Sequence, residues 1–349
     1  MRGEYKVPGG KLVAVDVEVA DGRLSEVAVS GDFFLEPDSA LDDINAALRG
    51  MPADSDAEQL AHAISTALDE SVSMIGFTSQ SVGIAIRRAL GHATSWADHT
   101  FDLIPPVVLD PAMHVALDEV IAREVASGER PPTLRFWDWD SPLVVIGSFQ
   151  SVRNEVDSEA AARYGIGVVR RISGGGAMFM EPGNCITYSL AVPASLVEGL
   201  SFEQSYAFLD QWVMGALAEV GINARYVPLN DIASDKGKIA GAAQKRFASG
   251  TVLHHVTMTY DIDAEKMTQV LRIGREKMSD KGTKSAAKRV DPLRSQTGMT
   301  RAAILESFAQ HFRGQYDTHD SDYTDPELEQ ARKLVDTKFR TEEWTHRVP

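Results

Sequence analysis

Two arginines followed by three glycines form the stretch of this chain with the clearest chemical potential. Residues 168–190 read VVRRISGGGAMFMEPGNCITYSL, so Arg170 and Arg171 lie just before glycines 174–176. Glycine lacks a β-carbon, so a ligand can approach the backbone closely and accept hydrogen bonds from its N–H groups. Arginine adds a positive charge with forked donors that suit a phosphate or a carboxylate. The stretch therefore predicts an anion-binding site without specifying the anion.

Several common nucleotide and hydrolase motifs are absent from the sequence. There is no GxxxxGK[ST] phosphate loop, and Phe179 stands where the dinucleotide fingerprint requires its last glycine. Neither HExxH nor GxSxG occurs. The remaining residues of the site must therefore come from other patterns further along the chain.

Two later stretches supply such patterns. Residues 230–246 read NDIASDKGKIAGAAQKR, and residues 253–257 read LHHVT. Together with RRISGGGAMF, their order and spacing resemble the lipoate–protein ligase family. The segments DPAMHVALDE, VVIGSFQ, KGTKSAAKRV and KFRTEEW are similar to further elements of that family. The resemblance covers about residues 104–349.

The resemblance implies a two-step reaction. Lipoate is activated with ATP to lipoyl-adenylate, and the lipoyl group is then transferred to a lysine of a carrier protein domain. The implied carriers are lipoyl domains, such as those of 2-oxoacid dehydrogenase acyltransferase subunits, or a glycine cleavage H protein. ATP and Mg²⁺ are the implied cofactors. Cations and backbone donors suit this chemistry, because they offset the charge that develops when a carboxylate attacks a phosphate.

The match to the family also implies roles for individual residues. Lys238 would bridge the lipoyl carbonyl and the phosphate, with Asn230 and Asp231 orienting it, and Asp231 would help to place Mg²⁺. The nucleotide would be held by Arg171, Gly176, Ala177, Met178, Phe179 and Lys238. Lipoate would be held by Arg170, Gly174, Gly175, Lys238 and His255. We choose His255 over His254 because adjacent residues of a strand point to opposite faces.

Two positions depart from the family pattern. Met180-Glu181 stands where HD is usual, and Val256 stands where the HHGT motif has glycine. We expect Met180 to remove a polar contact near the acyl pocket and Val256 to narrow its wall. Two strand-end aromatics, Trp137 and Trp139, are interpreted as core or rim residues rather than as a ligand platform.

A second function remains open within the same fold, namely octanoyl or lipoyl transfer without ATP through a cysteine nucleophile. The related octanoyltransferases place their thiol near the position of residues 226–229 here, where this chain has none. The single cysteine, Cys185, lies in an apolar strand pattern that is typical of a buried, inert thiol. A third possibility is a lipoate-binding protein without catalytic activity.

The elements that must position these residues form an α+β protein. Valines 13, 15, 17 and 19 alternate as in a half-buried strand, and Asp21-Gly22 predicts a tight hairpin. This part is similar to the accessory domain of lipoate ligases. We predict an accessory domain over 1–91, a linker over 92–103 and a catalytic domain over 104–349. The catalytic domain is expected to hold a central mixed β-sheet flanked by helices, in the manner of biotin and lipoate ligases, and helices are predicted over 110–128 and 202–220.

Composition excludes several other classes of protein. A net charge of −15 argues against a general nucleic-acid binder. A local exception is the basic run over 272–294, which could cover an adenylate or dock an acidic carrier domain. One cysteine permits no intrachain disulfide, and the sequence has no signal-peptide core or long apolar run. We therefore expect a cytoplasmic protein without a membrane partner.

Overall fold

The computed structural model describes residues 1–7, 9–91, 93–272 and 291–349 of the chain. These residues form two compact units, one of Met1–Asp98 with Ala194–Phe208 and one of His99–Pro193 with Leu209–Pro349. The excursion at 194–208, which groups with the N-terminal unit, was not expected from the sequence. Strand β6 (Phe101–Leu109) also begins inside the stretch predicted as a linker.

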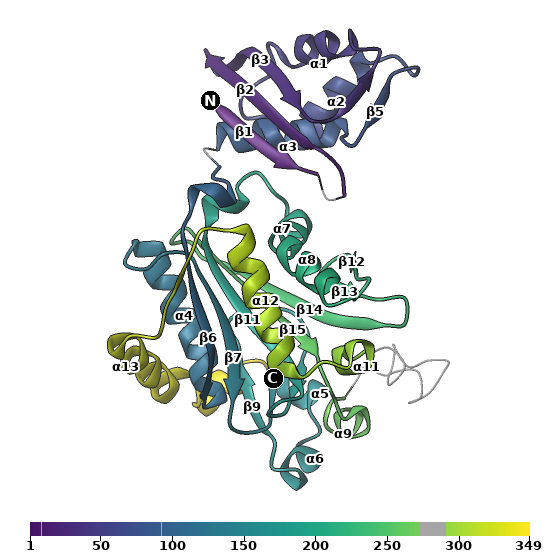
Figure 1. Ribbon diagram of the computed structural model, residues 1–349. Coiled ribbons are helices and arrows are strands. Elements are labelled where there is room, and N and C mark those ends of the chain that lie inside the picture. The colour runs from purple at the N-terminus through teal and green to yellow at the C-terminus, as the bar shows by residue number, and fades with distance from the viewer. Residues whose placement is uncertain (8, 92, 273–290) are drawn as a thin grey trace. The chain divides into compact units, whose positions relative to one another are not determined.

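The N-terminal unit is a small antiparallel sheet covered by helices (Figure 1). Its turn residues Asp21 and Gly22 both have positive φ angles, 51° and 72°, as the predicted Asp-Gly hairpin requires. Three of the four alternating valines of β2, at 13, 15 and 17, are buried, because that face packs against α3, whereas Val19 near the hairpin is exposed. The elements of this unit are β1 (Arg2–Lys6), β2 (Leu12–Ala20), β3 (Arg23–Gly31), β4 (Phe34–Glu36), α1 (Ala40–Leu48), α2 (Ala57–Ala67), β5 (Ser73–Ile75) and α3 (Ser79–Leu90).

The second unit is built on a mixed sheet of eight strands (Figure 1). Strand β6 runs parallel to both of its neighbours, β7 and β16, while the other pairs are antiparallel. This arrangement confirms the predicted mixed sheet. In spatial order the strands are β12 (Arg225–Val227), β13 (Asp231–Ala233), β14 (Lys238–Arg246), β15 (Thr251–Thr259), β11 (Cys185–Pro193), β7 (Thr133–Trp139), β6 and β16 (Thr318–Asp320).

A smaller sheet of three strands lies beside the large one, in the order β10 (Met178–Met180), β8 (Leu143–Ile146) and β9 (Gly167–Arg170). Helix α4 (Pro111–Ser127) packs between them, and it begins after the N-cap Asp110 and ends at Gly128, as predicted. Apolar side chains from α4 and from both sheets form one continuous core. The glycine stretch connects β9 to β10, so this core fixes both of its ends.

Helices α8 (Gln211–Glu219) and α12 (Arg301–Gln315) cover the opposite face of the large sheet, with Trp212 packed on Tyr188 and Phe312. The predicted helix over 202–220 is broken at Asp210 into α7 (Phe202–Leu209) and α8. The break falls where the chain passes from one unit to the other. The remaining elements are η1 (Trp96–Asp98), α5 (Val152–Glu155), α6 (Ser158–Arg163), η2 (Ala194–Val197), α9 (Ala264–Val270), α11 (Leu293–Thr297), α13 (Asp325–Leu334), η4 (Val335–Phe339) and α14 (Glu342–Thr345).

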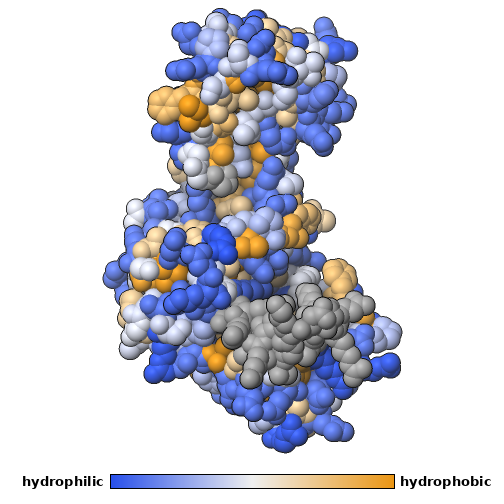
Figure 2. All heavy atoms as spheres, turned by 90° about the vertical axis from the view of Figure 1, so that its right-hand side faces the viewer, coloured by the Kyte–Doolittle hydropathy of each residue, from blue (hydrophilic) through white to orange (hydrophobic). Residues whose placement is uncertain are grey.

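The face of the molecule seen in Figure 2 is largely hydrophilic, with apolar residues scattered among polar ones. Such scattering is normal for a protein surface. Within the described part of the chain, no helix combines the length and the apolar character that a membrane span requires.

Candidate active site

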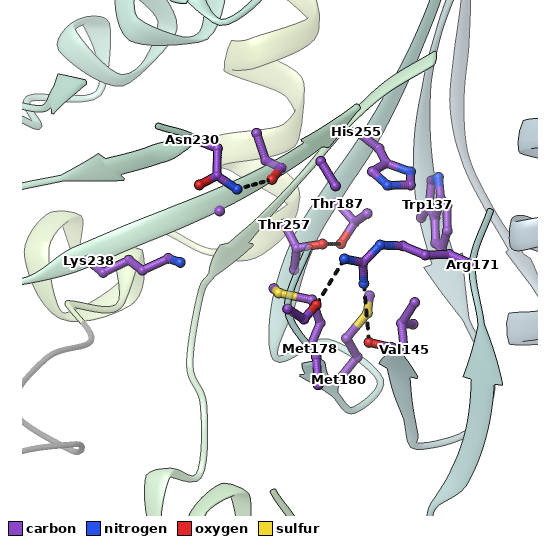
Figure 3. A pocket seen from close by; sticks show the side chains of 15 residues that line it. Trp137, Val145, Arg171, Met178, Met180, Thr187, Asn230, Lys238, His255 and Thr257 are labelled. Atoms are coloured by element: carbon purple, nitrogen blue, oxygen red, sulfur yellow. Dashed lines mark hydrogen bonds between the residues drawn. The ribbon is translucent and has the colours of Figure 1, made fainter. Parts of the chain in front are cut away.

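Residues from both sheets of the second unit line a pocket (Figure 3). Its empty space, counted together with the open solvent at its mouth, is about 580 Å³. One end holds Lys238 and Asn230, and the other end is formed by larger side chains from β7, β8, β10 and β15. The lining comprises Trp137, Val145, Arg171, Gly176, Ala177, Met178, Met180, Thr187, Asn230, Lys238, Gly241, Ala242, Ala243, His255 and Thr257. The three predicted motifs therefore meet at one place.

Lys238 reaches into the pocket from the start of β14 and points toward Arg171 on the far side (Figure 3). Its Nζ atom lies 2.7 Å from Oδ1 of Asp231, and both side chains remain partly exposed, at 45% and 37%. Gly241 leaves room for this pair, because a β-carbon there would come within 2.9 Å of the Lys238 Nζ atom. The amide of Asn230 donates to the Ala242 carbonyl and so ties the preceding loop to β14.

Arg171 lies beneath the glycine loop, and most of its donors are directed at that loop. Its Nη2 atom donates to the carbonyls of Gly174 and Gly176, at 2.5 and 2.9 Å. Gly175 has a φ of +91°, which favours glycine because other residues rarely adopt this conformation. The guanidinium thus holds the loop in shape while its charge stays at the pocket wall. Of the predicted loop residues, 176–178 line the pocket and 174, 175 and 179 do not.

Arg170 was predicted to contact lipoate, but its side chain is fully buried outside the pocket lining. The guanidinium donates to five backbone carbonyls, those of Gly147, Ser148, Gln150, Trp344 and Thr345. Adjacent strand residues point to opposite faces, so Arg170 turns away from the pocket as Arg171 turns into it.

His255 joins a chain of buried polar groups at the inner end of the pocket. Its Nε2 atom lies 2.6 Å from Ser173 Oγ, and its Nδ1 atom lies 2.9 Å from Asp118 Oδ2. The other carboxylate oxygen of Asp118 accepts from Arg135. Arg171 Nε donates to Ser173 Oγ, so the serine directs its own proton to His255. The imidazole must then carry its proton on Nδ1 and donate it to Asp118.

The charges at this end follow from burial and from the neighbouring groups. Burial lowers the pKa of His255, and Arg171 and His254 lower it further, although contact with Asp118 acts in the opposite direction. Burial alone would raise the pKa of the Asp118 carboxyl, but Arg135 and His255 outweigh it and lower that pKa. The histidine is therefore neutral and the aspartate charged at neutral pH, as the direction of the hydrogen bonds requires.

Strand alternation separates the neighbours of His255. His254 points to the opposite face, where its Nε2 atom lies 2.6 Å from Asp210. Val256 also points away and is absent from the lining, so the expectation that it narrows the pocket was wrong. Met180 does line the pocket, while Glu181 forms an ion pair with Lys266 at 2.7 Å.

Several lining residues were missed by reasoning from the sequence. Trp137 and Trp139 both belong to the core, as interpreted, and Trp137 also contributes to the pocket. The hydroxyls of Thr187 and Thr257 bond to each other at 3.0 Å on the floor of the pocket (Figure 3). Asp118, behind His255, offered one usable signal, since it is a charged residue next to Leu117 on the apolar stripe of its helix.

Cys185 lies in the core and is only 1% exposed, outside the pocket lining. Burial raises the pKa of its thiol to about 12. A thiol must ionise to act as a nucleophile, so this environment makes Cys185 inert.

At the predicted metal site, the carboxylate of Asp231 is paired with Lys238. Among the described residues no group of three His, Cys, Asp or Glu side chains could hold a metal. The basic run lies largely outside the described residues, at 273–290. Its described ends are Arg272, which pairs with Asp157, and Arg294, which pairs with Asp261.

A glycine loop and a lysine from separate strands line one pocket, and such a pocket is the natural candidate for an active site. The chain belongs to the family of the lipoyl protein ligase A/B catalytic domain, which matches residues 110–313. This membership confirms the family resemblance and the fold inferred from the sequence.

Relatives within this family carry out two kinds of reaction. The octanoyltransferase LipM of Brevibacillus brevis is 26% identical over 273 residues, which are 68% of this chain and 96% of the relative. Lipoate-protein ligase A subunit 1 of Thermoplasma acidophilum is 30% identical over 246 residues, 66% of this chain and 90% of the relative.

Two solved structures show the same fold. One is a bi-partite lipoate protein ligase from Thermoplasma acidophilum, described with its E2 lipoyl domain, with a TM-score of 0.63 and 28% identity. The matched part covers 71% of this chain and 97% of the chain of that structure. The other is a lipoate-protein ligase A bound with ATP, with a TM-score of 0.62 and 25% identity, covering 71% and 98%. The protein is thus an enzyme of the lipoate ligase and octanoyltransferase family, and membership alone does not choose between the two reactions.

Proposed function

We propose that this protein activates lipoate with ATP and transfers the lipoyl group from lipoyl-adenylate to a lysine of a lipoyl-domain carrier. One observation carries the proposal: the Lys238–Asp231 pair faces the glycine loop across the pocket, while the only cysteine is buried outside it. A cation opposite backbone donors is the arrangement that an acyl phosphate requires, and a cysteine transferase needs an accessible thiol.

In the first step the lipoate carboxylate attacks the α-phosphate of ATP, a P–O bond forms, and pyrophosphate leaves. Lys238 neutralises charge on the carboxylate and the phosphate, and Arg171 adds a second positive charge at the opposite wall. Mg²⁺ bound with ATP would neutralise part of the charge on the phosphates. One carboxylate beside the phosphates suits this ion, and Asp231 is the side chain that would hold it.

In the second step the acceptor lysine attacks the lipoyl carbonyl. A C–N bond forms, the bond from the carbonyl carbon to the phosphate oxygen breaks, and AMP leaves with its electron pair. The attacking amine, in its neutral form, releases one proton to solvent as the amide forms. Lys238, bridging the carbonyl and the phosphate, stabilises negative charge on both the carbonyl oxygen and the leaving group. The same lysine therefore serves both steps.

Octanoyl transfer without ATP is the second candidate, and the likeness to the octanoyltransferase LipM favours it. Its chemistry would need Cys185, because the chain has no other cysteine. With a thiol pKa of about 12 in the core, that residue would have to leave its strand before it could react.

An ATP–pyrophosphate exchange assay tests the proposal. We expect exchange that depends on lipoate, and lipoylation of a lipoyl domain when that carrier is added. Lys238→Ala should abolish both, whereas Lys236→Ala, in the same turn but outside the pocket lining, should leave both intact. Transfer of octanoate from an acyl carrier protein without ATP, lost in Cys185→Ser, would instead identify the transferase. Lipoate binding without exchange or transfer would identify a binding protein.

A further inference from the structure

Arg170 is a buried cation that is solvated by the protein backbone. Its side chain is completely buried, and all of its recorded hydrogen bonds go to main-chain oxygens. Among the described residues no carboxylate lies within ion-pair distance of it. A buried guanidinium without an acidic partner is costly, so a structure that keeps it gains something from its geometry or its charge.

On one side Arg170 holds the C-terminal turn α14. Its Nε and Nη2 atoms donate to the carbonyls of Trp344 and Thr345, at distances between 2.6 and 3.1 Å. Trp344 returns a hydrogen bond, since its indole Nε1 donates to the Arg170 carbonyl at 2.9 Å. The two residues therefore lock each other, although 174 positions separate them in the sequence.

On the other side Arg170 holds the turn at 147–150, through the carbonyls of Gly147, Ser148 and Gln150. This turn lies directly against the glycine loop. A β-carbon at Gly147 would come within 2.1 Å of the Gly175 carbonyl oxygen, and the Ser148 N–H donates to the Ser173 carbonyl at 2.8 Å. Any displacement of the turn must therefore move the loop.

We propose that Arg170 is a positioning residue for the nucleotide and that α14, at the far end of the chain, belongs to the scaffold of the nucleotide site. Arg171 shapes the glycine loop from within the pocket, and Arg170 braces it from behind through the turn at 147–150. The inference rests on the proposed function, because it assigns the loop to ATP. It adds two residues, Arg170 and Trp344, that no ligand needs to touch.

Loss of the Arg170 contacts should weaken binding of the nucleotide and leave binding of the acyl group unchanged. The acyl end of the pocket is formed by Trp137, Met180, Thr187 and Thr257, which lie on strands of the sheets and not on the braced turn. Nucleotide donors on the loop depend on its exact path, whereas the acyl wall depends on the core. A general loss of packing would weaken both ends alike.

The experiment compares three variants of the full chain. Arg170→Lys keeps the charge but has too few donors for five carbonyls, and Trp344→Phe removes only the indole N–H. Arg340→Lys is the matched control, because Arg340 lies on the same C-terminal segment but pairs with Asp110 at the surface. We expect Arg170→Lys to raise the KM for ATP at least tenfold and Trp344→Phe about threefold to fivefold. The KM for lipoate should stay within twofold, and the control should match the wild type.

Equal changes in both KM values, or a normal KM for ATP in both test variants, would overturn the inference. If Arg170→Lys does not fold, Trp344→Phe decides the question. Calorimetric binding of ATP provides a readout that does not require turnover, and the Kd should rise in the same order. If the wild-type protein shows no lipoate-dependent exchange, the proposed function is refuted instead. The effect of the variants on ATP binding can still be measured by calorimetry in that case.

Discussion

The two ends of the pocket are built in opposite ways. At the outer end Lys238 and Asp231 form one ion pair and stay partly open to solvent. At the inner end Asp118 is held by Arg135 and His255 at 1% side-chain exposure, and Ser173 is equally buried. The charged groups of the outer end remain available to a ligand, whereas those of the inner end are bound to one another.

This difference indicates a division of labour. A partly exposed pair can exchange its partner for a phosphate at little cost, because water solvates both charges. A buried network resists rearrangement, because any group left without its partner would carry a large desolvation penalty. The outer end is therefore suited to hold the reacting groups. The inner end is suited to form a rigid wall whose shape selects the substrate.

The strongest test of this comparison is Lys238→Ala. The variant removes the only cation at the outer end that the described pocket lining provides. We expect exchange and transfer to fall at least a thousandfold, because a positioned charge of this kind contributes strongly to catalysis. Stability should hardly change, since a partly exposed ion pair is worth little. Exchange kinetics and thermal unfolding measure the two effects, and a large loss of stability would contradict the division.

Asp118→Asn should show the reverse pattern. It leaves the buried guanidinium of Arg135 without an acidic partner, although its hydrogen bonds to His114 and Tyr323 remain, and this costs about 3 kcal/mol of unfolding free energy. Glu119→Gln is the matched control on the same helix, because its partners Lys338 and Arg123 both reach solvent. Urea unfolding measures the two changes. A smaller cost for Asp118→Asn than for Glu119→Gln would show that the inner network is not a rigid element.

The sequence predicted the outer end better than the inner one, and the reason is physical. Lys238, Asp231 and the glycine loop belong to short motifs whose residues are adjacent in space. Asp118 and Arg135 meet only because α4 packs on β7, and no local pattern records such a contact. Trp137 faced the same difficulty, since its strand position did not reveal which face the pocket would use.

Strand alternation explains several differences between the predicted and the observed site. Strand alternation was applied to His254 and His255, and the structure places them on opposite faces. The same rule separates Arg170 from Arg171 and Val256 from His255, and it explains why Arg170 and Val256 lie outside the pocket lining. Family motifs encouraged every residue within them to be assigned to a ligand. Strand alternation predicts that about every second side chain of these strands points away from the ligand.

The inner end should also lower the unfolding free energy of the protein in acid. His114 stacks on Trp137 with a centroid separation of 5.0 Å, and burial lowers its pKa to about 3. The unfolded chain binds a proton near pH 6.5, while the folded protein resists it, so this contribution is complete above pH 6.5 and is lost toward pH 3.

Between these values His114 should reduce the unfolding free energy by up to about 1.4 kcal/mol for each pH unit. Urea unfolding at several pH values, with His114→Gln beside the wild type, isolates this slope. We expect a shallower acid loss in the variant, and an exposed control, His346→Asn, should keep the wild-type slope. Identical slopes in His114→Gln and the wild type would show that the inner end tolerates a proton.

The smallest effect on activity is expected for Cys185→Ser, which lies in the core behind the inner end. Its Sγ atom is 3.8 Å from the Phe179 carbonyl, too far for a hydroxyl hydrogen bond, so serine should lose some stability there. Exchange and transfer should nevertheless stay within twofold of the wild type. Because the chain has no other thiol, this variant shows whether Cys185 acts as a nucleophile or only as part of the core. A loss of transfer with normal unfolding would give the inner end a chemical role. Retained transfer would leave the chemistry with Lys238.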